Sequence, residues 1–333
     1  MNIRKYLGAW IYDEKILLGE QFNFGHREVL LATNGLSRTS LIRASVPHGW
    51  GEGTNNHVYP EHFNKFGKAF PILSWSNRTT LSYKNKGYKN VSTTGSPWAH
   101  LLKAVEKKPV QAESKTDSQV TYFPTHSIPG GTVSHLLTQE MCNRLNSFGE
   151  VTVCLFWLDF VDPKTHTYYI DKGFKVICVG FKGNAGYDSP WAPVGGRVSF
   201  LPNLLELFKM TDVVVVDTVS TTFWYSLSLR KKTVILSENR SSTWWGNNAP
   251  LEIVSSNKDI LASVDSSLAK LDLSEPTDVN DFLYETAIKE IGLEETENFL
   301  KFIEGAGAMR DNVIDSAIIE PMCDYLESAS FSR

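Results

Sequence analysis

The stretch that decides the fold is TDVVVVDTVSTT, residues 211–222. Four consecutive valines between aspartates are typical of a strand that is buried on both faces of a parallel sheet. The change to small hydroxyl residues predicts a loop that leads into a helix over 221–229. Unpaired N–H groups and the dipole at the start of that helix favour an anion, so the loop is a candidate phosphate site. The alternative is a plain helix N-cap, because Ser and Thr are common there.

The rest of the second half alternates between short apolar runs and amphipathic segments. The runs predict strands over 120–123, 151–157, 175–179, 212–217 and 233–236, and the segments predict helices over 132–147, 163–172, 202–210 and 221–229. This alternation predicts a doubly wound parallel sheet. Helical spacing of apolar residues continues over 279–291, 293–304 and 311–328.

The first half shows an apolar segment at 28–32, a hydroxyl-rich segment at 37–45, and strand candidates at 69–76 and 90–95 that end in small or polar residues. Ligand loops in open parallel sheets follow strand ends in this way. Residues 106–118 are rich in Lys, Glu and Ser and lack periodicity, which predicts an interdomain linker, with a surface loop of a single domain as the alternative.

The fold class that we predict is α/β, with two Rossmann-like doubly wound domains facing a cleft. A length of 333 residues suits two domains. We expect an amino-terminal, acceptor-binding domain over 1–105, the linker over 106–118, a donor-binding domain over 119–305, and a carboxyl-terminal helix over 306–333 that returns to the first domain.

Composition excludes several classes of protein. The chain is 42% hydrophobic and 21% charged, as expected for a globular protein. A net charge of -4 with scattered Lys and Arg argues against nucleic acid as a partner. The four cysteines lack the spacing of a zinc site or a disulfide framework and predict buried thiols in a reducing compartment. No signal peptide or long apolar segment is present, so we expect a cytoplasmic protein, compatible with peripheral association at the inner face of the membrane.

Two histidines lie in glycine-bearing loops that follow strand candidates, one in each expected domain. His48 lies in PHGWGEG, residues 47–53, and His126 in THSIPGG, residues 125–131. Imidazole changes charge near neutral pH, so each is a candidate proton acceptor or phosphate partner. A structural histidine is the alternative in both cases.

Several carboxylates are further candidates. Glu52 is close to His48 in the sequence and is an alternative base. Glu238 follows a strand, where a carboxylate can bind a ribose hydroxyl, although a solvated turn residue is equally compatible. For Asp217 we favour a cap of the following loop over a sugar contact. Asp159 and Asp162 close the strand predicted over 151–157.

Searches for well-known motifs find no P-loop, no Gly-x-Gly-x-x-Gly after a strand, no nucleophile elbow and no His-Glu-x-x-His. An Asp-x-Asp pair that would hold a divalent ion on a nucleotide is also absent. We therefore expect no metal and no cofactor.

The order of these loops resembles the B-type glycosyltransferases, and within them the CDP-glycerol glycerophosphotransferase, sialyltransferase and capsular Kdo transferase group. The resemblance covers residues 48–236. It rests on His48-Gly49, Trp75-Ser76, Gly95-Ser96-Pro97, Thr125-His126-Ser127, and residues 204–217 followed by Ser220-Thr221-Thr222. The chain departs from the family pattern in having Ser127 where the family has proline.

The resemblance implies a metal-independent enzyme that transfers a sugar from a nucleotide donor to a glycan or glycolipid hydroxyl of a bacterial surface polysaccharide, with a CMP-linked acidic sugar such as a nonulosonic acid or Kdo ranked first. His48, with Glu52, would act on the acceptor hydroxyl. Ser76 and Ser96 are further candidates from the matched motifs. The donor nucleotide would be bound by His126, Ser127, Ser220, Thr221, Thr222 and Glu238.

Three alternatives accompany this expectation. A CDP-polyol phosphotransferase or a nucleotide-sugar epimerase would use the same arrangement. A non-catalytic glycan-binding or nucleotide-sugar-binding protein would instead use exposed tryptophans as stacking platforms, with the candidates Trp50, Trp98, Trp191, Trp244 and Trp245.

Overall fold

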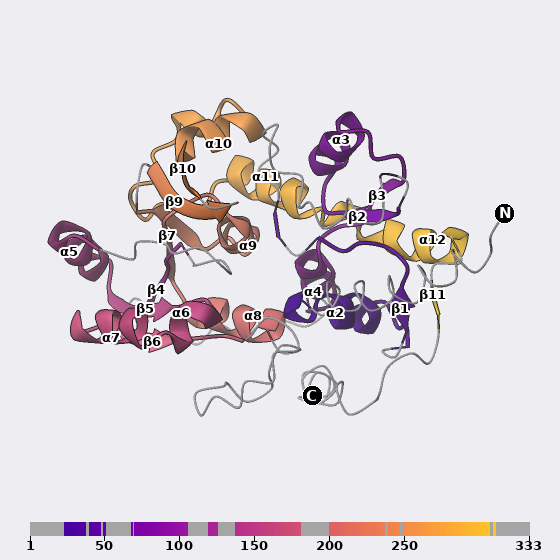
Figure 1. Ribbon diagram of the computed structural model, residues 1–333. Helices are drawn as coiled ribbons and strands as arrows, with labels where there is room; N and C mark the ends of the chain where they lie inside the picture. The colour runs from indigo at the N-terminus through magenta and orange to yellow at the C-terminus, as the bar shows by residue number, and fades with distance from the viewer. Residues whose placement is uncertain are drawn as a thin grey trace.

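A computed structural model describes residues 23–37, 40–47, 49–50, 68, 70–105, 119–125, 137–180, 200–236, 239–246, 249–306 and 309–310. These residues form a mixed α/β structure with parallel sheets and helices (Figure 1). The predicted linker over 106–118 lies outside the described residues.

The second half of the chain forms a five-stranded, all-parallel sheet of order β6-β5-β4-β7-β8. Its strands are β4 (Gln119–Phe123), β5 (Glu150–Cys154), β6 (Lys175–Ile177), β7 (Val213–Val216) and β8 (Lys232–Ile235). The valine run forms β7, which lies between β4 and β8 and is buried at all four positions. The strand order reverses between β4 and β7, where ligands of such sheets bind. The parallel sheet predicted for this half is thus confirmed.

Helices connect these strands with some differences from the prediction. They are α5 (Gln139–Ser147), α6 (Trp157–Val161), α7 (Pro163–Asp171), α8 (Phe200–Met210), α9 (Thr221–Ser228) and α10 (Asn257–Val264). Helix α5 begins after Thr138, whose side chain accepts a hydrogen bond from the Met141 N–H, so residues 137 and 138 of the predicted helix are not helical, and residues 132–136 lie outside the described residues. The strand predicted over 151–157 was too long, because Trp157 already begins α6.

A long hairpin follows β8 and was not predicted. It consists of β9 (Asn239–Gly246) and β10 (Ala249–Ser256), which pair antiparallel along their whole length. The first strand begins Asn-Arg-Ser-Ser-Thr, so it lacks the alternation of apolar and polar residues from which a strand is recognised.

The first half is smaller. It comprises the 3₁₀ turn η1 (Asn23–Gly25), α2 (His26–Thr33), β1 (Leu41–Ile42), β2 (Ile72–Ser74), α3 (Asn77–Asn85), β3 (Val91–Thr93) and α4 (Pro97–Val105). Strands β2 and β3 pair in parallel, within the predicted strand regions. The apolar segment at 28–32 lies in α2.

The carboxyl-terminal helices connect the five-stranded sheet to the β2–β3 pair. Helix α11 (Asp281–Ile291) packs on α9, and after the 3₁₀ turn η5 (Glu294–Thr296) helix α12 (Glu297–Ala306) packs on β3 (Figure 1). Strand β11 (Met309–Arg310) then pairs with β1, so the chain returns to its amino-terminal half. Of the helix expected over 306–333, residues 311–333 lie outside the described residues.

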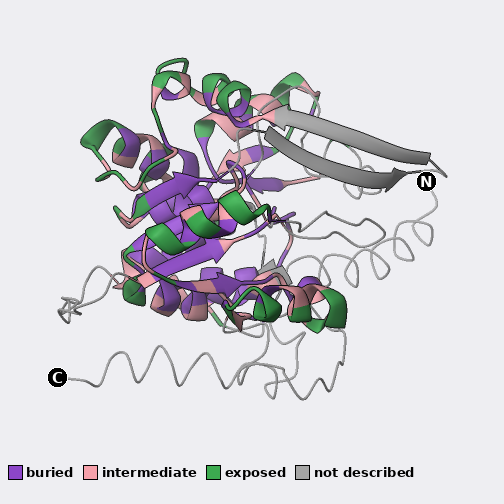
Figure 2. Ribbon diagram, turned by 90° about the vertical axis from the view of Figure 1, so that its left-hand side faces the viewer, coloured by how far each residue is buried: buried purple, intermediate pink, exposed green. Residues whose placement is uncertain are grey.

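One hydrophobic cluster contains buried residues of both halves. Figure 2 shows that the strands in the middle of the molecule are mostly buried, whereas exposed residues lie on the surrounding helices. In this cluster the ring of Tyr225 stacks on Trp98, with centroids 4.5 Å apart, and on Trp75, with centroids 6.0 Å apart. The Trp98 indole N–H also donates to Ser228 Oγ at 3.0 Å. Trp98 is 0% and Trp50 6% exposed, so these two tryptophans are core residues, and the expectation that they are exposed stacking platforms was wrong. The side chains of Trp191, Trp244 and Trp245 lie outside the described part.

Cys142 and Cys154 are buried free thiols and Cys178 is a half-buried one; Cys323 lies outside the described residues. Among the described residues, no helix combines the length and the hydrophobicity needed to cross a membrane.

Candidate functional site

The site predicted from the valine strand lies where the carboxyl ends of β4 and β7 meet. Asp217, directly after β7, accepts hydrogen bonds from the Tyr122 hydroxyl at 2.7 Å and from the Thr125 N–H at 2.8 Å. Burial raises the pKa of Tyr122, and the Asp217 charge adds to that effect. The Asp217 side chain therefore links the end of β4 to the end of β7, whereas it was expected to cap the loop that follows it.

The loop after Asp217 is held by Asn257, a residue that was not predicted from the sequence. Asn257, the buried first residue of α10, accepts the Val219 N–H through Oδ1 at 3.0 Å and donates from Nδ2 to the Asp217 carbonyl at 2.9 Å. An asparagine at the start of a helix is common, and nothing in its sequence position points to a loop nearly 40 residues earlier, so no sequence signal identified it.

The first turn of α9 follows this loop. Ser220 occupies the N-cap position in an extended conformation, but within the described part of the chain its side chain makes no capping hydrogen bond. Side chains do cap α3, α5, α7 and α11, through Ser76, Thr138, Asp162 and Asn280. The buried Thr218 hydroxyl likewise has no hydrogen-bond partner among the described residues. These hydroxyls and the helix dipole give the turn the chemistry of an anion site.

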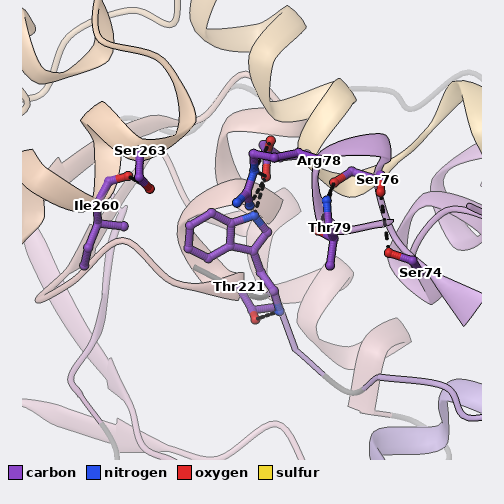
Figure 3. A network of polar contacts seen from close by, with 9 residues as sticks. Ser74, Ser76, Arg78, Thr79, Thr221, Ile260 and Ser263 are labelled. Carbon is purple, nitrogen blue, oxygen red and sulfur yellow. Dashed lines mark hydrogen bonds and ion pairs between the residues drawn. The ribbon is translucent and has the colours of Figure 1, made fainter. Parts of the chain in front are cut away.

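Residues from the first half of the chain reach this turn (Figure 3). The backbone N–H of Trp50 donates to Thr221 Oγ1 at 2.9 Å, and the Trp50 indole N–H donates to Glu290 Oε2 at 2.6 Å. Arg78, from α3, forms a two-pronged ion pair with Glu290 and lies 5.0 Å from the centroid of the Trp50 ring. Thr221 and Trp50, 171 positions apart in the chain, are thereby brought into contact.

Three other predicted site residues are buried within their own elements. Ser76 Oγ accepts the Thr79 N–H at 3.2 Å and Ser96 Oγ the Ala99 N–H at 3.1 Å, so each serves a helix start. Asp159 is buried within α6. Burial raises the pKa of Tyr169, and the charges of Asp217, Tyr168 and, to a smaller extent, Asp159 add to that effect.

The remaining predicted residues, His48, Glu52, His126, Ser127 and Glu238, lie outside the described residues. Their neighbours in the chain are described, however. Trp50 contacts Thr221, and Thr125 contacts Asp217. The chain adjoining each predicted histidine therefore reaches the same loop after β7.

The part of the chain that the structure describes contains no cluster of three or more His, Cys, Asp or Glu side chains able to hold a metal ion. The hydroxyls and N–H groups of the β7–α9 turn are groups that bind an anion directly.

Comparisons with known proteins give a distant similarity. No family model matches the sequence, and no curated protein matches it. The wall teichoic acid polymerase TagF is 12% identical over 87% of this chain and 66% of its own, with a TM-score of 0.28. TarM of S. aureus, in complex with fondaparinux, α-GlcNAc-glycerol and UDP, is 13% identical over 77% of this chain and 43% of its own, also with a TM-score of 0.28. The chain spans less than two thirds of either protein, and similarity at this level does not establish a family.

Proposed function

We propose that this protein is a glycosyltransferase that moves a sugar from a nucleotide donor to a hydroxyl of a bacterial surface glycan. The observation that carries the proposal is the β7–α9 turn, at the point where the strand order reverses. Among the described residues, the Ser220 side chain does not cap α9 and the Thr218 hydroxyl has no hydrogen-bond partner, and Thr222 adds a third hydroxyl. A nucleotide phosphate fits such a turn because both the N–H groups and the hydroxyls donate to it.

The proposed donor is a CMP-linked acidic sugar, such as a nonulosonic acid or Kdo, a choice that follows the sequence resemblance. In this proposal His126, Ser127, Ser220, Thr221, Thr222 and Glu238 bind the donor nucleotide, and His48, with Glu52, takes the proton of the acceptor hydroxyl. General-base help of this kind contributes about 100- to 10,000-fold in rate. The helix dipole and the hydroxyls stabilise the leaving nucleotide, so the proposed reaction uses no metal ion.

A thermal-shift screen with CMP, CDP, UDP and GDP tests the proposal. A nucleotide that binds only the folded protein stabilises it by about 2.7 kcal/mol at 100 times its Kd. We expect the cytidine nucleotides to raise the melting temperature most. Thr222→Val removes a hydroxyl from the turn and should reduce this shift, whereas Thr167→Val, on the exposed face of α7, should not. The absence of a shift with all four nucleotides would contradict the proposal.

Turnover separates the roles of the two histidines. His48→Ala should abolish transfer while nucleotide binding remains nearly intact, and His126→Ala should weaken nucleotide binding. Full turnover in both variants would remove these assignments.

A further inference from the structure

The contacts of Trp50 reach into the proposed phosphate site. Thr221 Oγ1 accepts the Trp50 backbone N–H at 2.9 Å. A hydroxyl that accepts one hydrogen bond keeps its own proton for donation, and the accepted bond restricts the directions in which that proton points. The Trp50 N–H therefore orients Thr221 as a donor at the first turn of α9.

Trp50 is itself held firmly. It is 6% exposed, and its ring packs against Trp224 of α9 with centroids 5.3 Å apart. Its indole N–H donates to a Glu290 carboxylate oxygen at 2.6 Å, a charge-assisted bond, which is stronger than one between neutral groups. Moving the Trp50 backbone away from Thr221 would break the hydrogen bond between its indole and Glu290.

Arg78 fixes the carboxylate to which Trp50 is bound. Its Nε donates to Glu290 Oε1 at 2.9 Å and its Nη2 to Oε2 at 2.6 Å, while the Glu290 side chain is 6% exposed. A carboxylate buried to this extent is costly unless it is paired, so the two hydrogen bonds from Arg78 pair the Glu290 carboxylate and fix its orientation. The three residues come from α3, the last turn of α11 and the segment at residues 49–50, all converging on the start of α9.

We infer that Trp50, Glu290 and Arg78 are positioning residues, which act through Thr221 to aim its hydroxyl proton at a phosphate of the donor nucleotide. The inference rests on the proposed nucleotide site, and it assigns the network a role in binding beyond joining the two halves of the chain. A purely structural network would affect the stability of the protein but not the nucleotide affinity of the folded molecules.

Two measurements on the same variants test this inference. Titration calorimetry with CMP, CDP, UDP and GDP, each used separately, measures affinity, and amide hydrogen exchange measures the protection of the Trp50 N–H. Trp50→Phe removes the indole N–H bond and reduces the ring that packs on Trp224, Glu290→Gln removes the charge, and Thr221→Val removes the hydroxyl. We expect each variant to lose about 10-fold or more in affinity, the size expected for a lost hydrogen bond to a charged group. We also expect faster exchange of the Trp50 amide in all three.

Two further variants make the test specific. Thr221→Ser restores the hydroxyl and should recover most of the affinity. Asp281→Asn removes the exposed ion pair with Arg230, which links the turn after α9 to the start of α11, and should leave affinity and Trp50 exchange unchanged. Circular dichroism and melting temperature establish which variants are folded.

The outcomes separate the inference from the proposed function. If folded Trp50→Phe and Glu290→Gln bind nucleotide like the unaltered protein, the positioning role is overturned. If Thr221→Val leaves Trp50 exchange unchanged, the inference is overturned as well, because the contact on which it rests is absent in solution. If the unaltered protein binds none of the four nucleotides while Trp50 exchange responds as expected, the contact chain stands and the proposed function fails.

Discussion

Among single residues, His100 shows how little sequence position says about a histidine's role. It is 3% exposed, and its Nδ1 lies 2.9 Å from the Asn34 amide nitrogen while its Nε2 lies 2.9 Å from the Thr94 carbonyl oxygen. The Asn34 amide nitrogen is a donor, because it also donates to the Leu30 carbonyl. Nδ1 therefore accepts, Nε2 carries the proton, and a second proton has no place. His48 and His126 were predicted as site residues because they lie in glycine-bearing loops, and His100 does not lie in such a loop.

This arrangement predicts that the folded protein loses stability in acid. Burial lowers the pKa of His100 to about 4 and that of His26 to about 3, below the value of 6.5 in an unfolded chain. Between pH 6.5 and 4 the unfolded state binds more protons than the folded state, so stability falls as the pH falls, by about 1.4 kcal/mol per pH unit for each histidine.

Urea unfolding at pH 7.5, 6 and 5 measures this effect. The free energy of unfolding should decrease steadily on acidification, and His100→Gln should make its pH dependence shallower by about one proton between pH 6 and 5. An identical pH dependence in the variant and the unaltered protein would show that His100 is not the group responsible.

At the scale of the elements, α11 ends at a position that leaves no space for a side chain. It stops at Gly292, which has φ 70 and accepts the left-handed conformation that ends many helices. A Cβ on Gly292 would lie 1.8 Å from the Trp75 carbonyl oxygen and 2.9 Å from the Cα of Gly95. The Ser96 N–H also donates to the Ile291 carbonyl at 2.8 Å. The end of α11 thus lies against the ends of β2 and β3 with no space for a side chain.

Gly292→Ala should therefore destabilise the protein far more than an alanine in the left-handed conformation does elsewhere. Gly173, after α7, is the matched control, because it has φ 86 and nothing within 4 Å of a built Cβ. We expect about 1–2 kcal/mol for Gly173→Ala from backbone strain alone and about 3 kcal/mol or more for Gly292→Ala, which adds the steric clash. Urea unfolding of both variants measures the difference. Equal effects would mean that the Trp75 contact is looser than described.

For the whole molecule, the continuous core bears on the expected division into domains. The cluster that contains Trp75 and Trp98 from the first half also contains Phe208 and Tyr225 from the second and Ile291 from α11. A second cluster packs Phe299 of α12 with Leu30 and Leu73. Such apolar contacts between halves favour a single cooperative unit, because unfolding one half would expose the core surface of the other.

We therefore predict that the protein unfolds in one transition. Tryptophan fluorescence, which reports on the shared core, and far-ultraviolet circular dichroism, which reports on all the helices, should give coincident urea curves. Two separated transitions would instead show that the halves fold as independent domains.

Much of the second half could be predicted because its signals are local. The valine run predicts a strand, the helical spacing over 202–210 predicts a helix, and the hydroxyl residues at 220–222 predict a helix start. The structure has β7, α8 and the start of α9 at these places. The hairpin β9–β10 and the late start of α5 escaped prediction, because polar strands and helix starts carry weak periodicity.

By itself, the sequence determined the α/β class, the parallel sheet and a hydroxyl-bearing turn after β7, since a continuous apolar run followed by small hydroxyl residues is a local pattern. Only the tertiary structure decided what surrounds that turn: Asn257 on its loop, Trp50 on Thr221, and Glu290 and Arg78 behind Trp50. Glu290 lies in the last turn of α11, which packs on α9, whereas Asn257 begins α10 and Arg78 lies in α3. Contacts between residues so distant in the chain depend on packing, which no local pattern records.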